Sequence, residues 1–272
     1  MRAVFYFLIT NLAVLVLAGI MFSLLSTLPF FADNPDMAGS LGGLFLICAV
    51  FGSLGAFVSL LMSKPIAKWS SKTKLIKEPV TSQERWLVRT VHELADQEGI
   101  GRPDVGVFPA AQANAFATGW NRDRALVAVS EGLMRQMNER EVRAVLAHEV
   151  AHISNGDMLV MTLIQGVLNT FVMFFARLIG FAIDTATRRR DSDSGGVGFG
   201  FYIGTFIAEI FLGMLASLVV FSFSRRREFK ADATAARLTT HQDMIAALRR
   251  LQGERNPQPA LPQGMRAMGI SS

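Results

Sequence analysis

Two histidines, His148 and His152, lie four residues apart and enclose Glu149 in the pattern H-E-x-x-H. Apolar residues recur around them at helical spacing, and Asn138 with Glu141 forms the pattern of a helix-capping box. Residues four apart share one face of a helix, so both imidazoles could bind one metal ion. Glu149 could then accept a proton from a water that the metal activates. Because such a pattern arises by chance in ~1% of chains this long, it predicts zinc-dependent hydrolysis only together with a second signal.

A third metal ligand is the second signal needed, because catalytic zinc usually has three protein ligands and keeps a fourth position for water. The chain has one cysteine, Cys48, which excludes a cysteine-based zinc site and an intrachain disulfide. Farther along, Glu228 and Asp232 form an E-x-x-x-D pattern at helical spacing. Glu228 could bind the metal, and Asp232 could accept a hydrogen bond from a ligand histidine. The alternative is that both are solvated acids paired with Arg225–Arg227.

The composition indicates a membrane protein. The chain has 272 residues, of which 51% are hydrophobic, and this is too apolar for an ordinary soluble domain. A net charge of +5 would also suit a nucleic-acid-binding protein, but the basic residues cluster beside the apolar stretches, which favours a membrane. Most apolar residues lie in four stretches, at residues 3–25, 41–63, 158–183 and 199–223.

The first two stretches predict a transmembrane hairpin. Residues 3–25 are long enough to span a bilayer, which takes ~20 residues, and exceed the ~7–15 residues of a signal-peptide core. A cleaved signal peptide is the alternative. The loop at residues 29–40 carries Asp33 and Asp36 but no Lys or Arg, whereas residues 64–77 carry five lysines. The positive-inside rule therefore places residues 64–77 in the cytoplasm and the acidic loop outside.

The last two stretches lie between His152 and Glu228. If both cross the membrane the chain returns to the side it left, and if neither crosses it never leaves, so the two residues lie on one side. A crossing hairpin would put Arg188–Arg190 outside, against the positive-inside rule, so a re-entrant hairpin is the alternative to the crossing that we favour.

A few residues inside the apolar stretches predict how the helices pack. Arg177 and Glu209 are costly in lipid, so we expect an ion pair or polar groups that line a cavity, with a transport role as the alternative. Gly52 and Ala56 form a small-xxx-small face suited to close helix packing.

Four motifs together resemble the HtpX family of bacterial membrane-bound zinc metalloproteases, which is related to the CAAX prenyl proteases of eukaryotes. They are the histidine motif with its continuation at residues 148–157, S-R-R-R-E-F-K-A-D-A at 224–233, N-A-F-A-T-G at 114–119 and L-I-T-N-L-A-V at 8–14. The resemblance extends from the N-terminus to about Leu251.

The resemblance implies an endoprotease of the bacterial inner membrane that faces the cytoplasm and acts in quality control and the stress response. It implies one zinc ion per chain, bound by His148, His152 and Glu228, with Glu149 as general base. It also implies a substrate-facing edge strand made of Asn114, Ala115, Phe116, Ala117, Thr118 and Gly119. An extended peptide can add to such an edge through backbone hydrogen bonds alone. Such proteases usually continue into a segment with His-Pro-Pro, so we expect a shortened C-terminal part here and assign no oxyanion donor.

These observations predict an α-helical integral membrane protein of about four transmembrane helices with a mainly helical α+β protease domain of the zincin type. Its expected partners are polypeptide substrates, above all membrane proteins with cytoplasmic loops, and the lipid bilayer. The alternatives are a CAAX-type processing protease, a non-catalytic membrane scaffold and a transporter. The predicted segments are the first hairpin at 1–63, the protease domain at 64–157, the second hairpin at 158–223 and the third-ligand segment at 224–272.

Overall fold

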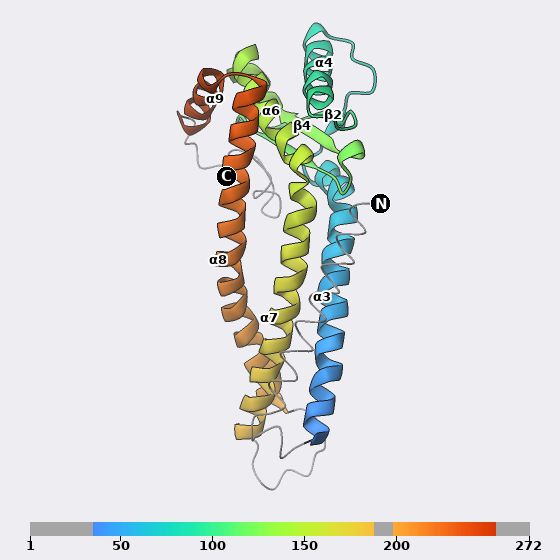
Figure 1. The fold of residues 1–272 in the computed structure, drawn as a ribbon, viewed down its shortest axis with the longest axis vertical. Coiled ribbons are helices and arrows are strands. Elements are labelled where there is room, and N and C mark those ends of the chain that lie inside the picture. Colours follow the sequence, from blue (N-terminus) through green and yellow to red (C-terminus); the bar gives the residue numbers. More distant parts are fainter. Residues whose placement is uncertain (1–34, 188–197, 254–272) are drawn as a thin grey trace. The chain divides into compact units, whose positions relative to one another are not determined.

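The computed structural model describes residues 35–187 and 198–253 of the chain. The expected span at residues 3–25, the motif at 8–14, the arginines at 188–190 and the tail after residue 253 lie outside the described residues. The helices are α3 (Pro35–Ser70), α4 (Ser82–Gln97), α5 (Glu131–Gln136), α6 (Glu139–Asn155), α7 (Asp157–Thr187), α8 (Phe199–Leu238) and α9 (His241–Gly253), as Figure 1 shows. The strands are β1 (Lys74–Leu75), β2 (Asp104–Phe108), β3 (Ala115–Thr118) and β4 (Leu126–Ser130), with a 3-10 turn η1 (Arg122–Arg124) before β4.

The chain forms two compact units. Of the described residues, the helical unit comprises 35–58, 161–187 and 198–223, and the sheet unit comprises 59–160 and 224–253. The long helices α3, α7 and α8 each contribute residues to both units. All the residues of the predicted metal site belong to the sheet unit.

Three helices in the described part of the chain are long and apolar enough to cross a membrane: Gly42–Ser70, Asp157–Thr187 and Phe199–Leu238. They contain the second, third and fourth apolar stretches, and large apolar side chains such as Phe51, Phe206 and Leu218 are exposed on them. The protein is therefore a mostly helical membrane protein. Our prediction of a loop up to residue 40 was wrong in part, because α3 already begins at Pro35, whose fixed φ suits the first turn of a helix.

Small residues bring α3 and α7 close together within the helical unit. A Cβ atom added at Gly52 would lie 2.6 Å from Thr170 Oγ1 and 2.9 Å from Thr170 N, and one added at Gly166 would lie 3.1 Å from the Cβ atom of Ala56. The predicted close packing of the face formed by Gly52 and Ala56 is thus confirmed.

Arg177 on α7 and Glu209 on α8 form the expected ion pair, with Arg177 Nη1 lying 3.5 Å from Glu209 Oε1. Arg177 Nη1 also donates to the backbone oxygen of Met173. Each charge thereby gains a partner within an apolar stretch, where an isolated charge would be costly.

The sheet unit is built on a four-stranded sheet with the order β1-β2-β4-β3. Strand β2 runs parallel to β4, while β1 and β3 run antiparallel to their neighbours. Strand β3 is an edge of this sheet.

The main core lies between this sheet and helices α4, α6 and α9. Val91 and Leu94 of α4, Val127 of β4, Leu146 of α6 and Ala247 of α9 are all fully buried in it. Because α6 is held between the sheet and two helices, the backbone that carries the two histidines is rigidly placed.

The contrast between two glycines on α3 tests the packing in the helical unit. Gly52→Ala should destabilise the protein by about 1–3 kcal/mol, because the new methyl group meets the backbone of Thr170. Thermal unfolding in detergent would measure the change. Gly55→Ala is the control, because a Cβ atom at Gly55 meets nothing within 4 Å. Equal melting temperatures for the two variants would contradict the close approach of α3 and α7.

Candidate metal centre

The helix that carries the histidine motif is defined by its own sequence at both ends. Asn138 Oδ1 accepts a hydrogen bond from the backbone N–H of Glu141, and the Glu141 carboxylate accepts one from the N–H of Asn138, so the capping box is confirmed. Gly156 ends α6 with φ at 72°, a left-handed conformation that favours glycine. The last turns therefore present His148 and His152 on one face, as their spacing predicted.

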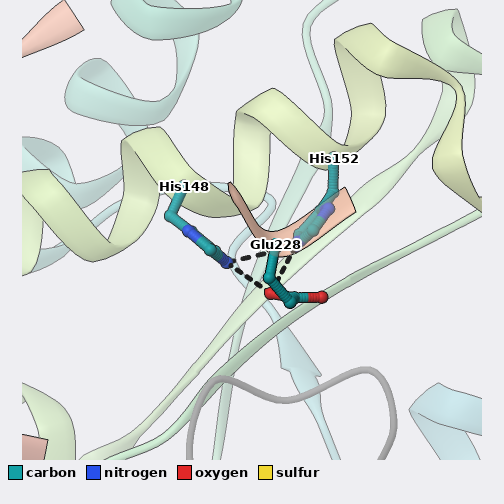
Figure 2. Close-up of side chains that lie close together, drawn as sticks. All are labelled: His148, His152 and Glu228. Atoms are coloured by element: carbon teal, nitrogen blue, oxygen red, sulfur yellow. Dashed lines mark hydrogen bonds and ion pairs between the residues drawn. The ribbon is translucent and has the colours of Figure 1, made fainter. Parts of the chain in front are cut away.

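The two imidazoles and the Glu228 carboxylate converge on one point (Figure 2). Nε2 of His148 lies 3.1 Å from Nε2 of His152, and Glu228 Oε2 lies 3.2 Å from the first nitrogen and 3.5 Å from the second. Both histidines are buried and come from α6, whereas Glu228 is half-exposed and comes from α8. The structure thus brings together three residues that the sequence separates by two long apolar stretches.

These distances fit a single metal ion. Two ligand atoms at ~2.0–2.1 Å from a tetrahedral zinc ion lie about 3.3 Å apart, which matches the three distances between the donor atoms here. Among the described residues, this is the one group of three or more His, Cys, Asp or Glu side chains whose donor atoms lie close enough together to share an ion.

A carboxylate lies against the second nitrogen of each histidine. His152 Nδ1 donates to Asp157 Oδ2 over 2.7 Å, and His148 Nδ1 lies 2.8 Å from Asp232 Oδ1, close enough for an ion pair but bent away from hydrogen-bond geometry. A carboxylate at Nδ1 favours the proton there and leaves the Nε2 lone pair free for a metal.

Asp157 was missed by our reading of the sequence. It is the first residue of α7, directly after Gly156, and its side chain is almost completely buried. The sequence did contain one signal, which is an acidic residue directly after the glycine that ends α6 and five residues after His152. Asp232, in contrast, lies where the E-x-x-x-D pattern suggested, next to a histidine of the motif.

Glu149 is buried beside the two histidines. It is 1% exposed, and neither of its carboxylate oxygens has a hydrogen-bond partner of good geometry. Burial raises the pKa of this carboxyl, although the nearby histidines and the backbone of Ala117 lower it in part. A buried, unpartnered carboxylate is unfavourable by itself, so its retention here suits a group that exchanges protons with a substrate or a water.

The predicted substrate strand at residues 114–119 contains β3 and lies next to the Glu149 carboxylate. The N–H of Ala115 donates to the Asn114 side chain and so points away from β4. The backbone groups of alternate residues in a strand point to the same side, so those of Ala117 also point away from β4. The residues from Asn114 to Gly119 are all buried, so this edge is covered in the present structure.

Neighbouring carboxylates dominate the electrostatics of the two buried histidines. Burial lowers the pKa of His148, but Asp232 and Glu228 outweigh this effect and raise that pKa to about 10. Burial likewise opposes protonation of His152, whereas Asp157 and Glu228 raise its pKa to about 9. Without a metal the site therefore holds protons strongly, and a cation would take their place.

Comparison with known proteins identifies the family. The sequence pattern of Peptidase family M48 matches residues 81–264, which include the histidine motif and Glu228. The chain belongs to peptidase family M48. The M48 chain is 50% identical to Protease HtpX of Alcanivorax borkumensis over 272 residues, which is 100% of this chain and 90% of that protein. It is 49% identical to Protease HtpX of Hahella chejuensis over 271 residues, with the same coverage.

A solved structure shares the fold of the M48 chain. The crystal structure of S. mikatae Ste24p matches 93% of this chain with a TM-score of 0.60 at 18% identity. This chain spans 63% of the length of that protein. Together the family and its relatives identify the M48 chain as a membrane metalloprotease, and the expected protease function is confirmed. The scaffold and transporter alternatives are thereby set aside.

Proton release should accompany metal binding at this site. The raised pKa values of His148 and His152 mean that protons occupy the site at neutral pH, so a metal must displace at least one of them. Apparent zinc affinity should therefore increase as the pH rises from about 6 toward 9. Titration calorimetry in buffers with different ionisation enthalpies would count the protons. Affinity that is flat across this range would contradict the proposed proton-binding state.

Proposed function

We propose that this chain is a zinc endopeptidase of the bacterial inner membrane that hydrolyses peptide bonds in misfolded or damaged membrane proteins. The observation that carries the proposal is the convergence of His148, His152 and Glu228 on one point, beside the buried and unpartnered carboxylate of Glu149. Quality control and the stress response are the corresponding cellular roles.

The proposed site holds one zinc ion per chain. His148 and His152 would bind it through Nε2 and Glu228 through Oε2, because these are the atoms that face one another. Asp157 and Asp232 would keep the Nδ1 protons of the two imidazoles in place. When bound, zinc polarises the scissile carbonyl and acidifies the attacking water.

Glu149 is the proposed general base and, later in the reaction, the general acid. Its carboxylate removes a proton from the attacking water as the carbon–oxygen bond forms, and then delivers that proton to the nitrogen of the amine as the carbon–nitrogen bond breaks. The raised pKa of this buried carboxyl suits it to hold the proton between the two steps. The mechanism needs no covalent link between enzyme and substrate.

The edge of β3 that faces away from β4 is the proposed binding site for an extended substrate segment. Ala115 and Ala117 turn backbone groups toward this edge, and Glu149 lies near Ala117. Backbone pairing along residues 114–119 would hold a peptide bond beside the general base with little demand on side-chain sequence, which suits damaged proteins as substrates. Because the edge is buried here, a substrate must displace what covers it.

The sheet unit is proposed to face the cytoplasm. Lys64, Lys68, Lys72, Lys74 and Lys77 follow the apolar part of α3, and such lysines favour the cytoplasmic side. Trp69 in the last turn of α3 is 83% exposed, although tryptophan is strongly apolar. An exposed tryptophan between lysines at the end of a span is typical of the membrane–water interface.

Two substitutions in the site separate metal binding from proton transfer. Glu228→Ala should lose most of the bound zinc, whereas Glu149→Gln should keep its zinc and lose casein cleavage by ~10²–10⁴-fold, the usual contribution of a general base. Zinc content by atomic absorption and cleavage rates would be measured on the same samples. Glu139→Gln is the control, because it removes an exposed carboxylate from the first turn of the same helix.

The outcomes identify which part of the proposal fails. Zinc retained by Glu228→Ala would reject the third ligand, and activity retained by Glu149→Gln would reject the general base. A CAAX-type processing protease shares the zinc chemistry, so preferential cleavage of a prenylated peptide over a membrane-protein loop would favour that function instead.

Single-cysteine labelling tests the proposed orientation, because Cys48 is the one cysteine in the chain. In a Cys48→Ala background, Lys77→Cys should react with a membrane-impermeant maleimide in inverted vesicles but not in intact spheroplasts. Asp36→Cys is the matched control and should show the opposite behaviour, because it precedes the span that starts near residue 42. Labelling of Lys77→Cys in spheroplasts would place the sheet unit outside the cytoplasm.

A further inference from the structure

One nearly buried carboxylate joins the elements that carry the proposed metal ligands. Glu98 follows the last residue of α4, and its side chain is 10% exposed. Its Oε2 accepts a hydrogen bond from Ser154 Oγ over 2.9 Å, and its Oε1 accepts one from Arg237 Nη2 over 2.6 Å. Ser154 lies two residues after His152 on α6, and Arg237 lies in the last turn of α8, the helix that carries Glu228.

We propose that Glu98 and Arg237 are positioning residues for Glu228. Their ion pair ties the end of α8 to the end of α4, and Ser154 ties the same carboxylate to the helix of the two histidines. This link fixes the position of α8 along its own axis relative to α6, and so it places Glu228 opposite the imidazoles. The inference rests on the proposed role of Glu228 as the third metal ligand.

The other packing of α8 in the sheet unit explains why such a link is needed. The fully buried residues of α8 there are Ala231 and Ala235, and Ala235 packs into the main core together with Met244 and Ala247 of α9. One longer side chain, that of the last residue of α8, Leu238, packs against the same core but is only partly buried. An alanine side chain has a single carbon atom and makes few packing contacts, so it limits the shift of a helix along its axis less than a longer side chain would. A polar contact with fixed partners limits that shift.

The contacts of Glu98 suit this task. Both carboxylate oxygens have a partner, as a nearly buried carboxylate requires, and the partners come from two different helices. Arg237 lies nine residues after Glu228, or about 14 Å along the helix at ~1.5 Å per residue. The ion pair therefore does not touch the metal site, and its effect must pass through the position of α8.

A neighbouring ion pair provides a matched control. Glu93 on α4 pairs with Arg143 on α6 over 3.1 Å, so it also joins α4 to the helix of the histidines. Neither residue contacts α8 in this pair. Loss of this pair should weaken the packing of α4 on α6 without changing the position of Glu228.

The test measures zinc affinity of the full-length protein in detergent by competition with a chromophoric chelator. Glu98→Gln and Arg237→Gln should each weaken zinc binding by roughly tenfold or more, as expected for residues that orient a ligand. Arg237→Lys should retain more affinity than Arg237→Gln, because it keeps the charge. Arg143→Gln should bind zinc as the wild type does. Thermal unfolding of the metal-free proteins checks that each variant is folded.

A second background distinguishes positioning from general destabilisation. If Glu98 acts through Glu228, then adding Glu98→Gln to a Glu228→Gln protein should change zinc affinity by less than about twofold, because coupled residues are not additive. Wild-type affinity in both Glu98→Gln and Arg237→Gln would overturn the proposal, as would an equal loss in the Glu228→Gln background. If Glu228→Gln alone leaves affinity unchanged, the third-ligand assignment fails instead, which is a separate result.

Discussion

The site depends on holding two buried imidazoles and one carboxylate within about 3.5 Å of each other, although they come from two helices that are far apart in the sequence. Burial of such groups is unfavourable unless each has a partner. Asp157 and Asp232 meet this condition at the outer nitrogens of the histidines, whereas Glu149 lies buried beside them without a hydrogen-bond partner. The resulting excess of negative charge attracts protons or a cation.

The helix that carries the two histidines is itself largely buried in the sheet unit. It is buried between the sheet and helices α4 and α9, and caps at both ends fix where it starts and stops. A rigid α6 supplies the two histidines and the base in a fixed arrangement. Helix α8 brings the Glu228 carboxylate to them and is held in the sheet unit by Ala231, Ala235 and Leu238 and by its ion pair with Glu98.

The long helices connect this chemistry to the membrane. α7 starts at Asp157, directly after the glycine that ends α6, and Glu228 lies ten residues before Leu238, the last residue of α8. Residues beside the metal centre are thus continuous with segments long and apolar enough to cross a bilayer. This continuity suits the proposed cleavage of membrane proteins.

Much of this protein could be predicted from local sequence. The H-E-x-x-H spacing, the capping box at Asn138 and Glu141, and the glycine after Asn155 act within one helix, so helical periodicity alone predicts the face shared by His148 and His152. The apolar stretches predict membrane helices because their length must match the bilayer. The pairing of Arg177 with Glu209 could be expected because an isolated charge in lipid is costly.

Contacts between distant segments were decided only by the tertiary structure. The sequence offered Glu228 as a third ligand or as a solvated acid, and only the position of α8 beside α6 brings its carboxylate to the histidines. Asp157 closes the motif at residues 148–157 and Glu98 lies in no motif, but neither residue could be assigned a role from the sequence. Their roles follow from which nitrogen, hydroxyl or guanidinium lies within hydrogen-bond distance. Spacing along the chain determines what one helix presents, whereas partners on different elements depend on how those elements pack.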